Sequence, residues 1–201
     1  LCLPGSRKSE INRLMPTFGK TLERFSNVLP NSRFILCSTP NVFEHSKNYL
    51  KSMPKNTVFL SPEEMGIEKY LAFKKASFKI SALALAASGT VSLELAANRT
   101  PMVIGYDMNY FSRQIIQMMM RIDTVNLVNL ITGNRNIPEC IGANFNSENL
   151  FLEMVRVYSN NQNQIKDFTT AMVLLGENNW PPNVRAANSI IRFYKDFKTV
   201  R

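Results

Sequence analysis

The sequence is poor in metal-ligating and redox-active side chains. It has one histidine, His45, and three cysteines, Cys2, Cys37 and Cys140, with no C-x-x-C spacing. An odd number of scattered cysteines argues against a disulfide framework, and so few Cys and His residues argue against a zinc site. Reduced thiols are typical of the cytosol. We therefore expect neither a bound metal nor a cofactor.

Long apolar runs and the common glycine-rich nucleotide motifs are also missing. No stretch approaches the run of about eighteen apolar residues that spans a membrane, and no signal peptide is evident. Neither G-x-G-x-x-G nor G-x-x-x-x-G-K-[ST] occurs, which argues against a dehydrogenase and a P-loop enzyme. We expect a protein that is soluble or lies on a membrane surface.

The chain does have enough apolar sequence for one large domain, and an excess of positive charge. Its 201 residues are 45% hydrophobic and 10% aromatic, which excludes a disordered chain. A net charge of +9 indicates an anionic partner, with phosphates, nucleic acid and acidic lipid all open. The chain lacks an initiator Met and begins with the apolar run Leu1-Cys2-Leu3 before a Pro-Gly turn, so we expect a fragment of a longer protein.

The first half of the sequence predicts strands that alternate with helices. Apolar residues at helical spacing predict a helix over 9–28, and further helices are expected over 41–52, 63–75 and 91–98. Short apolar runs that end in turns predict strands over 34–37, 57–60, 82–86 and 102–104, and Leu3 ends another strand. This alternation indicates an α/β fold, a Rossmann-like parallel sheet covered by helices.

After Gly105 the pattern changes to helices. They are expected over 110–121, 147–159, 162–175 and 184–197, with a short extended piece over 125–127. The Asn-rich stretch 159–163 predicts a turn between two of these helices. The domain should therefore end in a helical C-terminal tail.

The first candidate binding loop is Leu3-Pro4-Gly5-Ser6-Arg7, where a strand end is followed by a tight turn and a helix start. In an open parallel sheet, ligands bind beyond the carboxyl ends of the strands. Gly5 allows a ligand to approach the backbone closely, and Arg7 opposes the helix dipole unless an anion lies between them. An ordinary turn with a solvated Arg accounts for the same residues, so both interpretations stay open.

The second candidate loop is Ser88-Gly89-Thr90, where a buried strand passes into a helix. Free backbone N–H groups at the helix start and the two hydroxyls would bind a phosphate or diphosphate. Glu94, one turn further, is placed to reach the vicinal hydroxyls of a ribose. A Ser N-cap with a Glu in the first turn is the structural alternative. Because both loops follow strands of the same sheet, we favour a shared ligand site.

These loops and the segments after them resemble lipid A disaccharide synthase, a family of bacterial inverting glycosyltransferases with two Rossmann-like domains of the GT-B type. The similar motifs follow one another in order over residues 1 to about 142: Leu3-Pro4-Gly5-Ser6-Arg7 with Glu10-Ile11, Ser88-Gly89-Thr90 with Leu93-Glu94, Pro101-Met102-Val103-Ile104-Gly105-Tyr106, Phe111-Ser112, and Val125-Asn126-Leu127-Val128-Asn129-Leu130-Ile131. This chain departs from the family where it has Tyr110 and Val128 in place of Pro, and Gly142 in place of Gln.

The resemblance implies that residues 1–201 form the C-terminal, donor-binding domain of such an enzyme. The enzyme would join UDP-2,3-diacylglucosamine to 2,3-diacylglucosamine 1-phosphate and release UDP. The N-terminal half, with the general base and most of the acceptor site, would be missing, so the isolated fragment would be inactive. The resemblance further implies a cytoplasmic enzyme with a lipid acceptor and no nucleic-acid partner. Contact with the inner face of the bacterial inner membrane, and homodimerisation of the full-length enzyme, stay open.

Glycosyl transfer requires stabilisation of the leaving diphosphate, by a metal held between carboxylates or by fixed positive charge and helix N-termini. The sequence has no Asp-x-Asp pair, so we predict the metal-free solution with Arg7 as the catalytic residue. Glu94 is predicted to bind the ribose. The other predicted donor-binding residues are Gly5, Ser6, Ser88, Gly89, Thr90, Tyr106 and Asn129.

Residues 110–121 raise a separate question because they combine methionines with arginines. A Met-rich stripe at helical spacing is most often part of a core. A basic and apolar helix also suits contact with acyl chains or a membrane surface. The lysines that would extend such a basic rim are Lys69, Lys74, Lys75 and Lys79.

Two other functions stay open. A nucleic-acid-binding module fits the charge of +9, but basic clusters interleaved with exposed aromatic residues are not evident. A UDP-sugar epimerase, or another UDP-sugar transferase, would share this architecture and donor site.

Overall fold

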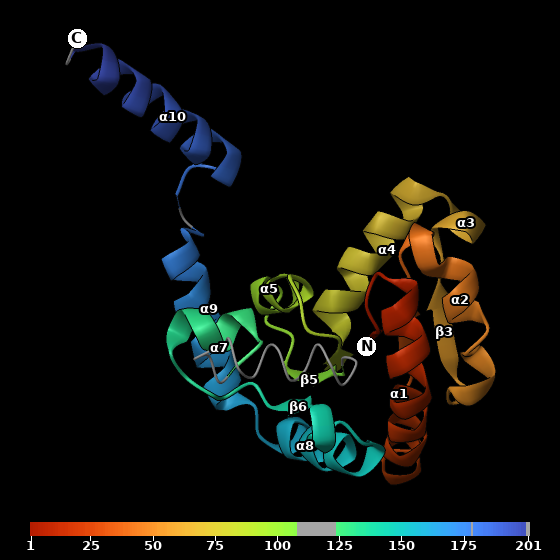
Figure 1. The fold of residues 1–201 in the computed structure, drawn as a ribbon. Coiled ribbons are helices and arrows are strands. Elements are labelled where there is room, and N and C mark those ends of the chain that lie inside the picture. The colour runs from red at the N-terminus through yellow and green to blue at the C-terminus, as the bar shows by residue number, and fades with distance from the viewer. Residues whose placement is uncertain (108–123, 178, 200–201) are drawn as a thin grey trace.

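A parallel β-sheet forms the centre of the computed structural model, which describes residues 1–107, 124–177 and 179–199 (Figure 1). In the described residues six strands pair in the order β3-β2-β1-β4-β5-β6, and every neighbouring pair is parallel. The strands are β1 (Cys2–Leu3), β2 (Phe34–Cys37), β3 (Thr57–Leu60), β4 (Ala84–Ala86), β5 (Met102–Tyr106) and β6 (Glu139–Ile141). The predicted Rossmann-like α/β fold is confirmed.

The strands are joined mainly by helices. These are α1 (Lys8–Val28), α2 (Phe43–Lys47), α3 (Pro62–Met65), α4 (Ile67–Ile80), α5 (Val91–Ala97), α7 (Leu127–Thr132), α8 (Ser147–Ser159), α9 (Gln162–Leu175) and α10 (Pro182–Thr199). Short 3-10 turns cover Pro40–Val42, Leu50–Ser52 and Gly142–Asn144.

Both faces of the sheet are buried, because helices cover both, and successive strand residues point to opposite faces. On one face Cys2 and Leu85 pack with α1 and α8, and on the other face Leu3 and Ala86 pack with α4, α5, α7 and α9. Each core is closed by fully buried aromatic rings, Phe18 on the first face and Phe168 on the second. The apolar runs of the strands are thus explained by two helix layers.

Most predicted elements are confirmed, and several are confirmed to the residue. The strands over 34–37 and 57–60 and the helices over 147–159 and 162–175 lie where the apolar pattern places them. The single helix expected over 41–52 is wrong, since this stretch is divided into α2 and two 3-10 turns. The helix expected over 63–75 is interrupted at Gly66, whose φ of +79° separates α3 from α4.

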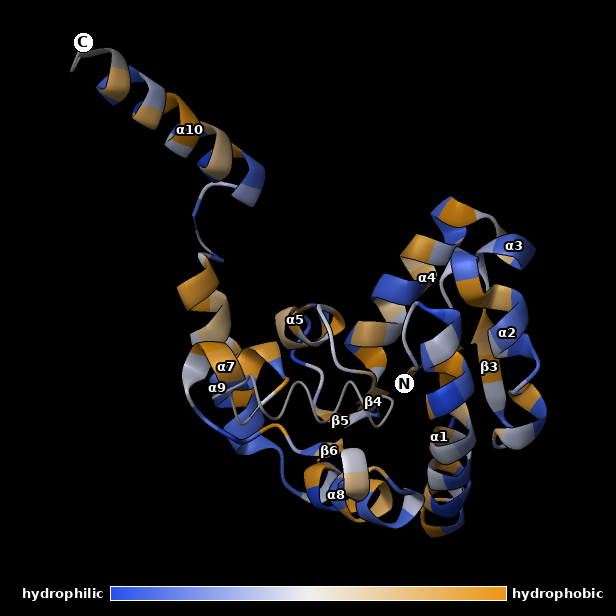
Figure 2. Cartoon of the chain, in the orientation of Figure 1, coloured by the Kyte–Doolittle hydropathy of each residue, from blue (hydrophilic) through white to orange (hydrophobic). Residues whose placement is uncertain are grey.

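The predicted helical tail is present as α10, which projects away from the sheet (Figure 1). Hydrophobic and hydrophilic residues alternate along it (Figure 2). Its large apolar side chains, among them Ile190 and Phe193, are exposed. Within the described residues, no helix combines the length and the apolar character needed to cross a bilayer.

Candidate functional site

The order in which the strands are added to the sheet reverses at its centre. From there the order goes through β1, β2 and β3 to one edge strand and through β4, β5 and β6 to the other, so β1 and β4 are neighbours. After β1 the chain enters α1 on one face, and after β4 it enters α5 on the opposite face. The two loops therefore diverge, which leaves a crevice at the carboxyl ends of the strands.

A pocket of about 360 Å³ occupies this crevice, and we call it the seam pocket. It is lined by Leu3, Gly5, Ser6, Arg7, Glu10, Cys37, Thr39, Tyr70, Lys74, Ala87, Ser88, Gly89, Thr90, Val91 and Glu94. Seven residues predicted from the sequence are brought together here: Gly5, Ser6, Arg7, Ser88, Gly89, Thr90 and Glu94. Their proximity is a structural finding, while their binding of a donor stays a prediction.

The carboxylate of Glu10 organises the first loop. Its Oε2 accepts hydrogen bonds from the backbone N–H groups of Ser6 at 3.0 Å and Arg7 at 3.2 Å. Its Oε1 lies 2.9 Å from Nη1 of Arg7. The anion that the sequence required between Arg7 and the start of the helix is thus a side chain of the same helix. The Arg7 side chain remains 75% exposed beside the pocket.

Gly5 is needed for this arrangement. Its φ is +106°, a conformation that favours glycine, and a Cβ atom at this position would collide with the carboxylate of Glu10. A purely structural reason for Gly5 therefore exists beside the predicted approach of a ligand.

The second loop leaves backbone donors unused. Ser88 Oγ donates to the carbonyl of Val125 at 2.9 Å, and Ser92 Oγ donates to the carbonyl of Gly89 at 2.8 Å, which ties the loop down at both ends. Within the described residues, no hydrogen bond uses the N–H groups of Gly89, Thr90 and Val91. Thr90, not Ser88, is the N-cap residue of α5, and its side chain makes no capping hydrogen bond. Three N–H donors thus stand at the edge of the seam pocket.

An ion pair joins α4 to α5 in the wall of the seam pocket. Nζ of Lys74 lies 2.9 Å from Oε2 of Glu94, and the Lys74 side chain is only 23% exposed. The ammonium also lies 5.3 Å from the centre of the Phe78 ring. Lys74 is one of the four lysines of the basic rim considered in the sequence analysis; its charge is paired with Glu94, and contact of that rim with a membrane stays a prediction.

A third part of the wall was missed by the sequence analysis. Cys37 ends β2 and Thr39 lies two residues later, and Tyr70 comes from α4 with only 4% of its surface exposed. Burial raises the pKa of Tyr70 from its ordinary value to about 12. Oγ1 of Thr39 is buried and has no hydrogen-bond partner among the described residues. The position after β2 was the available signal, since this strand also ends at the carboxyl edge of the sheet.

Two predicted donor-binding residues are not among those that line the seam pocket. Tyr106 ends β5 and packs in part against the core on the α1 side of the sheet. Asn129 is fully buried, where its Oδ1 accepts from the N–H of Ile137 at 3.1 Å and its Nδ2 donates to the carbonyl of Ile137 at 2.8 Å. The structure thus gives Asn129 a role in holding the segment before β6.

The question raised by residues 110–121 lies outside the described residues, and so does the family difference at Tyr110. The other two differences, Val128 and Gly142, lie in α7 and in the 3-10 turn after β6. No group of three or more Cys, His, Asp or Glu side chains that could hold a metal is found in the described ranges.

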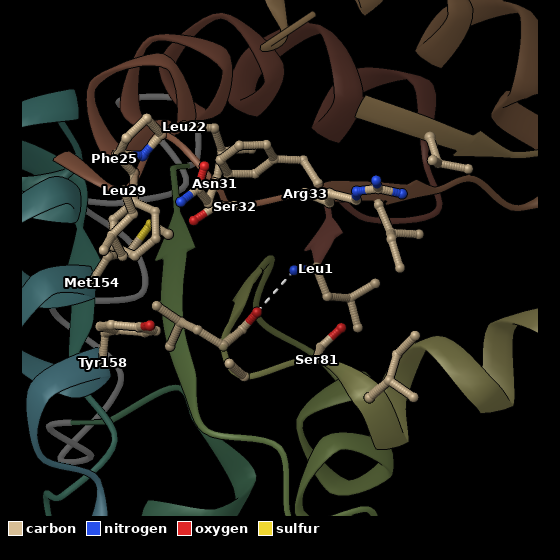
Figure 3. A pocket seen from close by; sticks show the side chains of 17 residues that line it. Leu1, Leu22, Phe25, Leu29, Asn31, Ser32, Arg33, Ser81, Met154 and Tyr158 are labelled. Atoms are coloured by element: carbon tan, nitrogen blue, oxygen red, sulfur yellow. Dashed lines mark hydrogen bonds between the residues drawn. The ribbon is translucent and has the colours of Figure 1, made fainter. Parts of the chain in front are cut away.

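A second cavity, of about 540 Å³, lies at the amino ends of the strands, opposite the carboxyl ends that line the seam pocket (Figure 3). Leu29, Met154 and Tyr158 gather on one side of it, and Leu1 lies on the other (Figure 3). The nitrogen of Leu1 donates to the carbonyl of Leu83 at 2.8 Å. This cavity is at the amino ends of the strands and mostly apolar, and its lining lacks the paired carboxylates and cations of the seam pocket.

Over most of its length the chain is similar to a set of bacterial proteins. The family model described as lipid-A-disaccharide synthetase matches residues 1–179. The lipid-A-disaccharide synthase of Ruegeria pomeroyi is 39% identical over 191 residues, which are 95% of this chain and 48% of that protein. The synthases of Rhodospirillum centenum and Rickettsia prowazekii are 35% and 33% identical to this chain. Each match covers 94% of this chain, and the two matches cover 46% and 49% of those proteins. The chain spans about half the length of the curated relatives it matches.

Proposed function

Because this chain belongs to the lipid-A-disaccharide synthetase family, we propose that its seam pocket binds the nucleotide-sugar donor of a glycosyltransferase in lipid A synthesis. The observation that carries the proposal is the meeting of the loops at Arg7 and at Ser88-Gly89-Thr90 in one pocket. Both loops follow central strands at the carboxyl edge of a parallel sheet, which is where this fold binds nucleotides.

The donor's diphosphate faces the second loop in this proposal. The unused N–H groups of Gly89, Thr90 and Val91 donate to its oxygens, as N–H groups do at other phosphate sites. The guanidinium of Arg7 approaches from the first loop, where its exposure leaves donors free beyond the one that faces Glu10. Fixed positive charge and oriented N–H groups then stabilise the leaving diphosphate.

The ribose faces Glu94, whose carboxylate lies in the same wall, 2.9 Å from Lys74. A carboxylate accepts hydrogen bonds from two vicinal hydroxyls, which is how acidic residues bind ribose in other nucleotide sites. Arg7 and Glu94 together thus bind the diphosphate and the ribose of a nucleoside diphosphate.

The proposed reaction joins UDP-2,3-diacylglucosamine to 2,3-diacylglucosamine 1-phosphate with inversion at the sugar carbon. The bond from that carbon to the diphosphate breaks as the acceptor hydroxyl attacks, and UDP leaves with the electron pair. In this proposal the acceptor site and the general base belong to the half of the relatives that this chain does not match. This chain corresponds to the donor domain of a GT-B enzyme, and alone it transfers no sugar.

Calorimetric titration of residues 1–201 with UDP tests the donor site, with ADP as the comparison nucleotide. We expect UDP to bind with a dissociation constant of roughly hundreds of micromolar, because one wall of a two-domain cleft makes only part of the contacts. Amide NMR shifts should change at residues 5–10 and 87–94 and not around Leu29 and Tyr158. A folded chain that binds no UDP, or binds it at the second cavity, would refute the proposal. Disaccharide synthesis by the chain alone would refute its assignment as a donor half.

A further inference from the structure

The seam pocket contains a charge arrangement that the donor role alone does not explain. Two carboxylates, Glu10 and Glu94, lie in a pocket whose proposed ligand carries a diphosphate. Each carboxylate is paired with a cation, Arg7 in the first loop and Lys74 on α4, at 2.9 Å in both cases. Without those cations the pocket would repel its ligand.

Resting on the proposed donor site, we infer that Lys74 is a positioning residue that neutralises Glu94 and holds its carboxylate toward the ribose. Lys74 acts through Glu94, so that the same pocket accepts both a ribose diol and a diphosphate.

The contacts of Lys74 support a fixed position. Its side chain is 23% exposed, whereas the Glu94 side chain is 49% exposed, so the cation is the more enclosed partner of the pair. Its stem lies in the third turn of α4 and its ammonium lies over the ring of Phe78. A cation that lies over an aromatic ring and is also paired with a carboxylate has few alternative positions.

The ion pair uses only part of the hydrogen-bonding capacity of the Glu94 carboxylate. Oε2 of Glu94 is the atom that faces Lys74, which leaves Oε1 and the second lone pair of Oε2 to accept hydroxyl groups. An ionised carboxylate with no neighbouring cation would still accept hydrogen bonds from a neutral nucleoside but would oppose each added phosphate. Lys74 should therefore matter more as the ligand carries more negative charge.

Titrations with uridine, UMP and UDP, at low ionic strength, separate this role from the alternatives. The variants are K74M, which keeps an unbranched side chain beside Phe78, K74R, which keeps the charge, E94Q, and the double variant K74M/E94Q. The matched control is K75M, which removes an exposed lysine from the same helix outside the pocket. Thermal unfolding of each variant confirms that it is folded, and K74Q replaces K74M should the latter unfold.

We expect K74M to weaken UDP binding about tenfold more than uridine binding, with UMP between them. K74R should restore most of the loss, and K75M should change none of the three affinities. In the E94Q background, removing Lys74 should cost less than about twofold, because no carboxylate is left to neutralise.

Three results would overturn the inference while leaving the donor site in place. Equal losses for uridine and UDP would show that Lys74 only packs, and unchanged affinities would show that it is idle. A loss of UDP affinity in the E94Q background as large as in the wild type would mean that Lys74 contacts the diphosphate directly. Failure of the wild-type chain to bind UDP would remove the proposed function itself, and the inference with it.

Discussion

The guanidinium of Arg7 lies 2.9 Å from the carboxylate of Glu10, one turn further along α1. Since the same carboxylate accepts the N–H groups of Ser6 and Arg7, one acidic side chain both caps the helix and keeps a cation beside the seam pocket. The ligand binding proposed for Arg7 and the folding of the helix start would therefore be linked through Glu10, and variants of the two residues should behave differently.

Arg7→Ala should weaken UDP binding by about tenfold or more, because a charge-assisted contact with the diphosphate is lost. Uridine, which has no phosphate, should bind with unchanged affinity. Lys8→Ala is the control, since Lys8 is the adjacent exposed cation and does not line the seam pocket. Calorimetry on both variants checks this, and equal UDP affinities for the two would leave Arg7 as a solvated turn residue.

Glu94→Gln should weaken UDP binding by about 1–3 kcal/mol, the cost of losing a charge-assisted hydrogen bond. The preference of the wild-type chain for UDP over 2′-deoxy-UDP should shrink in this variant, because the carboxylate no longer distinguishes the diol. Glu68→Gln, an exposed change on α4, serves as the control. A full preference for UDP in folded Glu94→Gln protein would contradict the ribose assignment.

Glu10→Ala should lower the free energy of unfolding by about 0.5–2 kcal/mol, the usual effect of removing a helix cap. The two N–H groups at Ser6 and Arg7 lose their acceptor. Urea unfolding followed by circular dichroism measures the change, with Glu23→Ala, exposed on the same helix, as the reference. Equal stabilities of the two variants would show that water replaces the Glu10 carboxylate at no cost.

Much of the fold could be predicted because its elements carry strong local signals. The strand over 34–37 is a continuous apolar run, and the helix over 162–175 has apolar residues on one face, so burial and local pattern agree. Strand β6 was missed because it has only three residues and includes a glutamate. The carboxylate of Glu139 is satisfied by the N–H of Val125 at 2.9 Å, a tertiary contact that no local pattern reveals.

The site shows the same division. Gly5 and Ser88 were found because ligands bind after the strands of a parallel sheet, a rule that needs only the order of elements. Lys74 and Tyr70 were missed as pocket residues because periodicity does not show which face of α4 lies along the crevice. Asn129 was included through the family resemblance. Its side chain is buried and forms hydrogen bonds with the backbone of Ile137.

Two threonine variants test whether the buried hydroxyl of Thr39 in the pocket wall contributes to stability. Thr39→Val should change the free energy of unfolding by less than about 0.5 kcal/mol, because Oγ1 of Thr39 has no partner to lose among the described residues. Thr100→Val should cost about 1–3 kcal/mol, since its buried Oγ1 donates to the carbonyl of Phe78 at 2.6 Å. Chemical unfolding of both variants provides the comparison. A large loss for Thr39→Val would reveal a partner, such as an ordered water, at this hydroxyl.

The cysteines should react slowly in the folded chain. Burial raises the pKa of Cys2 to about 12 and that of Cys140 to about 11, and it raises the pKa of Cys37 as well. A raised pKa keeps the thiol protonated to a higher pH, so at pH 8 the reactive thiolate is scarcer than in a free cysteine. Alkylation followed by mass spectrometry should show little modification at pH 8 and rapid modification in denaturant. Fast labelling of any cysteine in the native chain would contradict its burial.

The neighbouring positions of β1 and β4 have a consequence for how the molecule folds. Cys2 pairs with Leu85, so this contact closes a loop of more than eighty residues, and its entropic cost is paid before the two binding loops meet. No smaller folding unit can contain a complete seam pocket, because its walls come from both sides of that closure. A nucleotide that binds there stabilises only the fully assembled sheet, and the increase in melting temperature with ligand concentration becomes a measure of cooperative folding.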